Sequence, residues 1–167
     1  EVVPNADVII HPSYSGFGEV ATSAGFVSFM FSWSLLGRFD KYLSTLASIS
    51  LISDMMPLLD YNRRFLRLVF QNYKEGEFYP IDLLKEDGVY DENAIGMRIA
   101  PKINALGRLL DNESINHIVR YFVTPDMSIV NKLYAWIAKT NDGRKVESKR
   151  AEENMPDVNT DDSAIVI

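Results

Sequence analysis

Apolar residues recur at intervals of three and four through most of the chain, and this spacing predicts a predominantly α-helical protein. Residues 24–36 are apolar on nearly every side, which predicts a helix that is buried over most of its surface. Residues 6–10 (ADVII) are rich in β-branched side chains, which favours a buried strand of a parallel sheet. The expected fold is therefore mainly helical with a few short strands. Helices are predicted over residues 19–36, 39–53, 60–73 and 80–85, and in stretches that begin near Pro101, at Asp111 or Asn112, and at Thr124.

Four of the predicted helices have a candidate buried stripe, and five have a candidate start. The stripes are Leu43, Leu46, Ala47 and Ser50; Phe65, Leu68, Val69 and Tyr73; Ile115, Ile118, Val119 and Phe122; and Ile129, Leu133, Trp136 and Ile137. The starts are Asp60, Pro80, Asp91 or Asn93, Asp111 or Asn112, and Thr124 followed by Pro125. His117 falls between stripe positions and is expected at the surface.

The end of the chain has a different character. Residues 144–162 are almost entirely polar, with a basic part over 144–150 and an acidic part over 151–162, which indicates an exposed connector. We expect a first domain over 1–124, a connector helix and linker over 125–160, and the first strand of a second domain over 161–167. Because the chain starts with Glu1 and ends as a strand begins, we expect it to be a piece of a longer protein.

Composition limits the classes of function. The chain has 167 residues, of which 47% are hydrophobic and 24% charged, as in an ordinary globular domain. Its formal net charge of −6 argues against coating nucleic acid through overall charge, but a local basic groove remains open. The absence of cysteine excludes disulfides and thiolate metal sites, and it is compatible with a reducing, cytoplasmic location. No segment resembles a signal peptide, and the apolar run at 24–36 is shorter than the ~20 residues that span a bilayer.

Residues 95–109 (IGMRIAPKINALGRL) are the stretch whose composition is hardest to explain by packing alone. Pro101 can be the first residue of a helix, where its missing N–H has no cost. Asn104 and Arg108 are then four residues apart on one face, and an amide beside a guanidinium suits a phosphate. The alternative is a helix whose polar face meets only water.

Other polar residues have two or three interpretations each. Asp54 at the end of an apolar run can cap a helix, form a turn or bind a metal together with other ligands. His11 can act as a ligand or base at the end of the predicted strand, or be structural. Arg63, Arg67 and Lys74 form a basic stripe that faces either nucleic acid or solvent. Glycine-rich phosphate loops, Gly-x-Ser-x-Gly and His-Glu-x-x-His are absent from the sequence.

Several segments, in order, resemble the middle of RecJ-like single-strand-specific exonucleases of the DHH phosphoesterase superfamily. Residues 96–109 (GMRIAPKINALGRL) are similar to the family's Asn-Ala-x-Gly-Arg element, and 53–58 (SDMMPL) to its Asp-Val-(Val/Met)-Pro-Leu motif. Weaker similarities cover the remainder of the chain: 6–12 (ADVIIHP), 23–25 (SAG), Asn62 with Arg63, and Asn141 with Arg144 and Lys145.

The resemblance implies an α/β parent domain with a parallel sheet and divalent metals, followed by a long helix and a second α/β domain. It implies hydrolysis of single-stranded DNA from the 5′ end with Mn²⁺ or Mg²⁺, in a cytoplasmic protein of repair and recombination. Asp54 would be a metal ligand, and Arg108 with Asn104 would hold the substrate phosphate. The implied partner is single-stranded nucleic acid rather than a membrane.

Departures from the family pattern leave other functions open. The family's earlier Asp-rich motifs and Asp-His-His would precede residue 2, so we expect the chain alone to be inactive. His11, Ser50, Leu106 and Leu110 stand where the family usually has Asn, Gly, Ala and Gly. The alternatives are a non-catalytic scaffold with the same fold, and a sister phosphodiesterase that acts on short oligonucleotides.

Overall fold

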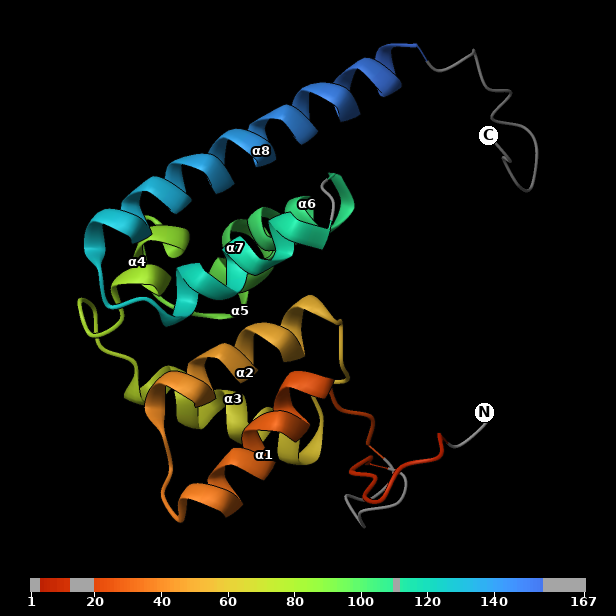
Figure 1. Ribbon diagram of the computed structural model, residues 1–167, viewed down its shortest axis with the longest axis vertical. Coiled ribbons are helices and arrows are strands. Elements are labelled where there is room, and N and C mark those ends of the chain that lie inside the picture. The colour runs from red at the N-terminus through yellow and green to blue at the C-terminus, as the bar shows by residue number, and fades with distance from the viewer. Residues whose placement is uncertain (1–3, 13–19, 110–111, 155–167) are drawn as a thin grey trace. The chain divides into compact units, whose positions relative to one another are not determined.

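The computed structural model describes residues 4–12, 20–109 and 112–154, and for 108, 109 and 112–114 it describes the backbone alone. The described residues contain helices and no strand (Figure 1). The chain forms two compact units, which divide between Ala100 and Pro101. The helices are α1 (Ala24–Leu36), α2 (Lys41–Ser53), α3 (Asp60–Asn72), α4 (Tyr79–Lys85), α5 (Glu92–Ala94), the π-helix η1 (Ile95–Ile99), α6 (Ala100–Leu109), α7 (Asn112–Val123) and α8 (Met127–Glu153).

Helix α1 is shorter and more exposed than its sequence predicts. Its N-cap is Ser23, whose hydroxyl accepts a bond from the Phe26 amide at 3.2 Å, so the helix begins at Ala24 rather than at 19. Gly37 ends the helix with a φ of 64°, in the left-handed conformation that glycine adopts easily. Only Phe26 and Phe29 of this helix are buried, so the prediction of burial on most of its surface is wrong.

Helix α2 buries hydroxyl groups instead of the predicted leucines. Ser44, Thr45 and Ser48 are buried, whereas Leu43 and Leu46 are partly exposed. Each hydroxyl donates to a carbonyl within one turn: Ser44 and Thr45 both reach the carbonyl of Lys41 at 2.8 Å, and Ser48 reaches that of Thr45 at 2.7 Å. Because these bonds are made within the helix, burial leaves no donor unpaired. Periodicity of apolar residues therefore misplaced the buried face.

Helices α1, α2 and α3 pack into the lower bundle of Figure 1 around aromatic side chains. Phe26 meets Phe65 edge-to-face, with ring centroids 4.7 Å apart. Leu66 is buried, whereas Leu68 is 45% exposed, which corrects the predicted stripe of α3. Asp60 is the first residue of α3 rather than its cap, and Leu59 takes the cap position without a side-chain bond.

The segment after α4 is tied together by Lys85, whose side chain is fully buried. Its ammonium donates to the carbonyls of Gly88 at 2.6 Å and Glu86 at 3.2 Å, and to the Glu75 carboxylate at 3.0 Å. Arg98 in turn donates from Nε to the carbonyl of Lys85 at 2.7 Å. Arg98, which is in the conspicuous basic stretch, therefore has a structural contact.

The predicted start of a helix at Pro101 is wrong, because the chain is already helical from Glu92. Asp91 is the N-cap, as one of two predicted residues, and it accepts a bond from the Ala94 amide at 2.7 Å. Proline inside an α-helix collides with the carbonyl four residues back. Here a π-turn precedes it: the amide of Ala100 donates to the carbonyl of Ile95, five residues back. The wider turn accommodates Pro101 without ending the helix.

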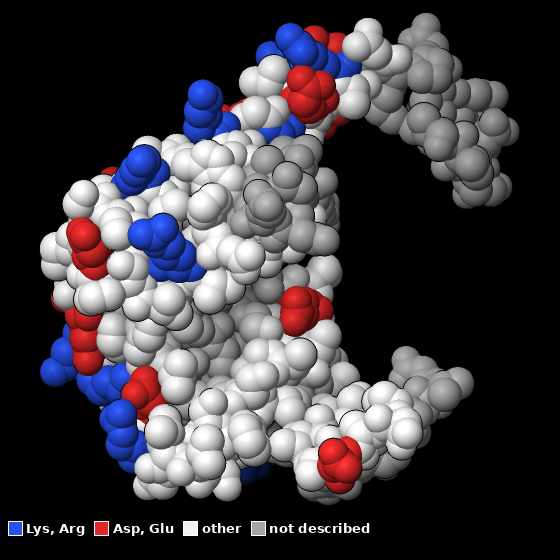
Figure 2. Space-filling view, in the orientation of Figure 1, with Lys and Arg blue, Asp and Glu red and all other residues white. Residues whose placement is uncertain are grey.

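In the second unit, α7 and α8 pack against each other. Tyr121 is fully buried, whereas Ile115 and Val119 are 44% and 56% exposed, so the predicted stripe of α7 is wrong. Asp126 rather than Thr124 caps α8, accepting from the Ser128 amide at 2.9 Å. Acidic and basic side chains lie close together toward the C-terminal end of α8 (Figure 2), in pairs such as Arg150 with Glu147 at 3.0 Å.

Residues 6–10 do not form the predicted strand. Val8 is 77% exposed and Ile10 is 45% exposed. An extended segment becomes a strand by pairing with another, and within the described ranges no other segment pairs with this one. The predicted strand at 161–167 lies outside the described residues, as does Asp111. None of the described helices is long and apolar enough to cross a membrane.

Candidate site around Asp54

Asp54 lies where α2 ends and the chain turns toward α3. Its amide donates to the carbonyl of Ser50 at 3.0 Å, and the residue takes the C-cap position. Met55 follows with a φ of 53°, in a region of backbone conformation that residues other than glycine rarely adopt. The Asp54 carboxylate is exposed, so both of its oxygens can be reached from solvent.

Two serines of α2 hold this carboxylate. Ser50 donates from Oγ to one carboxylate oxygen at 3.1 Å, and Ser53 lies 3.5 Å from the other. Ser50 stands where the resemblance expects glycine, so this departure adds a hydroxyl bond to the candidate ligand. Hydrogen bonds of this kind orient metal-binding carboxylates in other proteins.

Gly25 lets α1 approach α2 beside Ser50. A Cβ at Gly25 would lie 2.6 Å from both Cβ and Oγ of Ser50, which is closer than real contacts allow. The glycine in the segment 23–25 is therefore required by packing against the residue that binds Asp54. Residues 23–25 are part of the resemblance to the family, but the steric role of Gly25 follows only from the packing of α1 against α2.

Asn62 connects the turn after Asp54 with the start of α1. Its side chain is fully buried, and its amide nitrogen donates to the carbonyls of Ala21 at 2.8 Å and Pro57 at 2.9 Å. Thr22 donates from Oγ1 to its amide oxygen at 3.0 Å. Sequence reasoning noted Asn62 only as part of a family motif. Its role in positioning two loops depends on contacts 40 residues apart along the chain.

The described residues offer one candidate metal ligand, Asp54, rather than a complete set. A carboxylate oxygen suits Mn²⁺ and Mg²⁺, and the exposed Asp54 fits that role. Within the part of the chain that the structure describes, no group of three or more His, Asp or Glu side chains gathers in one place. The assignment of Asp54 as a metal ligand thus stays a prediction.

The predicted phosphate clamp belongs to the second unit. Asn104 and Arg108 are both in α6, four residues apart, and Asn104 is exposed. The side chain of Arg108 lies outside the described part of the structure. Leu106, between them, is fully buried, so this departure from the family pattern concerns packing. The joint action of Asn104 and Arg108 on a phosphate stays a prediction.

All three residues of the basic stripe, Arg63, Arg67 and Lys74, are exposed. None of the three side chains forms an ion pair with another described residue, in contrast to Arg64, which binds Asp60 at 3.1 Å. Arg63 and Arg67 lie on α3, whereas Lys74 lies in the chain that follows its last residue, Asn72. Exposed cations without an ion pair among the described residues can contact phosphates, and they are equally compatible with solvent.

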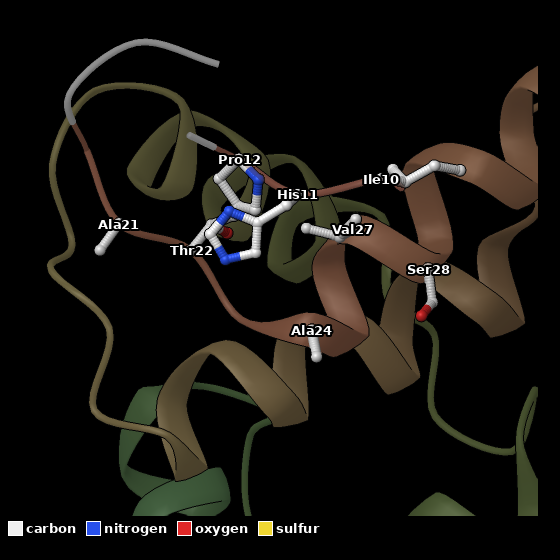
Figure 3. Close-up of a pocket in the computed structure, with 8 residues that line it drawn as sticks. All are labelled: Ile10, His11, Pro12, Ala21, Thr22, Ala24, Val27 and Ser28. Atoms are coloured by element: carbon white, nitrogen blue, oxygen red, sulfur yellow. The ribbon is translucent and has the colours of Figure 1, made fainter. Parts of the chain in front are cut away.

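His11 lines a pocket beside the start of α1. The pocket has a volume of about 390 Å³ and is lined by Ile10, His11, Pro12, Ala21, Thr22, Ala24, Val27 and Ser28. Figure 3 shows the imidazole of His11 next to Pro12 and Thr22. None of the described lining residues is acidic, so a His–carboxylate pair of the kind used in catalysis is not found among them. A catalytic role for His11 gains no support from this arrangement.

Comparison with known proteins places the chain near one class of nuclease. No protein-family model matches the chain. The single-stranded-DNA-specific exonuclease RecJ of Bacillus subtilis is 30% identical over 178 aligned residues, which cover 99% of this chain and 22% of that protein. RecJ of Thermus thermophilus is 27% identical, over 98% of this chain and 25% of that protein. The chain therefore spans about a quarter of the length of these curated relatives.

The fold is also shared with RecJ. A crystal structure of exonuclease RecJ bound to manganese matches 93% of this chain and 41% of its own, with a TM-score of 0.78 and 22% identity. RecJ from Thermus thermophilus in complex with Mg²⁺ matches 84% of this chain and 23% of its own, with a TM-score of 0.71 and 24% identity. The chain is thus similar to a segment of RecJ in both sequence and fold, as its motifs predicted.

Proposed function

We propose that this chain is part of a metal-dependent exonuclease that hydrolyses single-stranded DNA from the 5′ end. The observation that carries the proposal is the similarity to RecJ over 99% of the chain, which includes both Asp54 and the Asn-Ala-x-Gly-Arg element. We further propose that residues 1–124 belong to an α/β domain with a parallel sheet, that 125–160 connect it to a second domain, and that the site needs ligands beyond this chain.

In this proposal each group has a distinct task. Mn²⁺ or Mg²⁺, when held by Asp54 together with ligands beyond this chain, would supply activation of water and stabilisation of the phosphodiester charge. The Asp54 carboxylate supplies one oxygen ligand, while Ser50 restrains its orientation through the 3.1 Å hydrogen bond. Asn104 and Arg108 hold the substrate phosphate by charge-assisted hydrogen bonds. The chain by itself is expected to be inactive, because Asp54 is its single predicted metal-binding carboxylate.

Arg63, Arg67 and Lys74 are proposed as an additional contact with the strand. Their support is that all three are exposed and lack ion pairs with described residues. Neutralising all three is expected to weaken DNA binding and to flatten its dependence on salt, by ~0.7 in logarithmic slope for each phosphate that the variant no longer binds. Unchanged binding would return the stripe to a solvent-facing role.

The test uses the complete protein that carries this chain and measures Mn²⁺-dependent degradation of a 5′-labelled single strand. Asp54→Ala and Arg108→Ala are each expected to abolish activity while the circular dichroism spectrum stays unchanged. The matched controls are Asp87→Ala and Lys139→Ala, which remove an exposed acid and an exposed base elsewhere. Near-normal activity of either Asp54→Ala or Arg108→Ala would contradict the assignment.

The same complete protein also distinguishes the proposed exonuclease from two alternative functions. A non-catalytic scaffold would bind a strand without degrading it under any metal, and residues preceding the chain would lack an Asp-His-His motif. A sister phosphodiesterase would degrade short oligonucleotides faster than long strands. Measuring rates against strands of several lengths distinguishes this enzyme from the proposed exonuclease.

A further inference from the structure

A second pocket lies in the second unit, between α7 and α8. It has a volume of about 360 Å³ and is lined by His117, Arg120, Ile129, Lys132, Leu133 and Trp136. Small-molecule sites usually have volumes of ~300–1,000 Å³. The pocket is made of residues outside the proposed metal and phosphate site, and no motif of the sequence pointed to it.

Each helix contributes one cation and one aromatic ring to this pocket. His117 and Arg120 are three residues apart on α7, and Lys132 and Trp136 are four apart on α8, so each pair lies on one helix face. The rings of His117 and Trp136 meet edge-to-face, with centroids 5.5 Å apart and planes at 82°. This contact holds the indole at the pocket wall, because it fixes the ring between two packed helices.

The cations of the pocket have no acidic partner within the described part of the chain. Arg120 and Lys132 are exposed, and neither forms an ion pair with another described side chain. The described lining residues include no acid, although the chain as a whole has a net charge of −6. By comparison, Lys145, Lys149 and Arg150 farther along α8 each have an acidic partner. The local excess of positive charge therefore favours an anion.

The aromatic and aliphatic part of the lining adds a second requirement. Trp136 is partly buried with Ile129 and Leu133 beside it in the lining, so an ion alone would leave this apolar surface uncovered. A ligand that carries both a phosphate and a flat ring satisfies both parts, because nucleobases stack on aromatic side chains. We propose that the α7–α8 pocket binds one nucleotide of a single strand, with the phosphate at Arg120 and Lys132 and the base against Trp136.

The proposal rests on the proposed single-strand nuclease function for the source of the nucleotide, but its test does not depend on hydrolysis. The complete protein is prepared with Trp33, and any tryptophan outside this chain, replaced by phenylalanine, so that Trp136 is the fluorescent reporter. An oligothymidylate is titrated in EDTA, which prevents metal-dependent cleavage. We expect saturable quenching of Trp136, because the stacked base contacts the indole directly.

Three further ligands identify which part is recognised. Thymidine monophosphate is expected to quench more weakly than the strand, whereas inorganic phosphate and an abasic strand are expected to leave Trp136 unchanged. Equal quenching by the strand and the monophosphate would point to a free nucleotide as the ligand and overturn the strand assignment. An abasic strand that quenches as well as the oligothymidylate would overturn the stacking role of Trp136.

The variant Arg120→Gln/Lys132→Gln tests the cations without altering the core, since both side chains are exposed. The affinity for the strand, measured by quenching of Trp136, should fall about tenfold or more. The logarithmic slope of affinity against salt concentration should become shallower by ~1.4. The control Lys139→Gln/Lys145→Gln removes the same charge from α8 outside the pocket and should have a smaller effect. Equal effects of both variants, or no response of Trp136 to any ligand, would overturn the proposal.

The outcome can be separated from that of the proposed function. Metal-dependent degradation that persists without a Trp136 response would refute the pocket and leave the nuclease standing. Quenching by the strand in a protein that cleaves nothing would support the pocket and refute the nuclease.

Discussion

Replacing Asn62 with alanine tests whether one buried amide holds together the loops around Asp54. The Asn62 side chain is fully buried and makes three hydrogen bonds, to Ala21 at 2.8 Å, Pro57 at 2.9 Å and Thr22 at 3.0 Å. The two carbonyls can only accept, so the amide nitrogen must face them. Alanine cannot replace any of these bonds, so both carbonyls would be deprived of this donor.

The expected loss follows from the number of bonds. A hydrogen bond within a protein contributes ~0.5–1.5 kcal/mol net, so three bonds predict a loss of about 3 kcal/mol in the free energy of unfolding. Domains of this size have a total of ~5–15 kcal/mol, so the change is large. The variant Asn62→Asp should cost more, because a carboxylate would face two carbonyl oxygens with no hydrogen to share.

The assay is urea unfolding followed by the fluorescence of Trp33, which lies in the same unit, with Trp136 replaced by phenylalanine. The matched control is Asn72→Ala on the same helix, because Asn72 is exposed and makes one bond, to the carbonyl of Leu68 at 2.8 Å. We expect the control to change stability by less than about 0.5 kcal/mol. If Asn62→Ala cost no more than Asn72→Ala, the argument from buried hydrogen bonds would be refuted.

Three further predictions concern packing, a buried charge and pH. Gly25→Ala should destabilise the first unit by ~1–3 kcal/mol in the same urea assay, because its Cβ would lie 2.6 Å from Ser50. Gly143→Ala, in open space on α8, should instead stabilise the second unit by ~0.5–1 kcal/mol, measured by urea unfolding with Trp136 as the reporter and Trp33 replaced by phenylalanine. Lys85→Met should cost ~2–4 kcal/mol, because it removes the hydrogen bonds of the buried ammonium to the carbonyls of Glu86 and Gly88. Exposed Lys74→Met should change stability little, and equal effects would exclude a structural role for the buried ammonium. Burial raises the pKa of Tyr42 from 10.0 to about 12, so the neutral phenol stabilises the fold below pH 10 and this contribution is lost as pH rises toward 12. Unfolding free energies measured across that range should therefore fall less steeply in Tyr42→Phe than in the parent, and parallel curves would contradict the assignment.

Local signals in the sequence predicted several elements of this fold. Asp91, as one of two candidate residues, caps a helix, and Pro80 lies in the first turn of α4, because capping and proline geometry depend on neighbouring residues alone. The buried hydroxyls of α2 escaped prediction, since a serine that bonds its own helix looks polar in sequence but behaves as a small core residue. The prediction of a strand at 6–10 was wrong, because a strand forms only by pairing with another segment.

The candidate site was predicted mainly by resemblance, and its supporting contacts were not. Asp54 and its motif were identified in the sequence, but the bond from Ser50 and the close approach of Gly25 depend on how α1 and α2 pack. The same holds for the α7–α8 pocket. His117 was predicted at the surface, correctly, but its contact with Trp136 requires that two helices pack side by side.

The π-turn before Pro101 also restricts the length of the chain at this point. A π-turn is equivalent to an α-helix with one residue inserted, and here the inserted residue falls within Ile95–Ile99. Deleting one residue from this turn would restore α-helical bonding and bring the proline ring against the carbonyl four residues back. Related proteins that keep a proline here should therefore keep the number of residues between it and the cap at Asp91. In an alignment, gaps should accumulate in the neighbouring loops and be rare between these two positions.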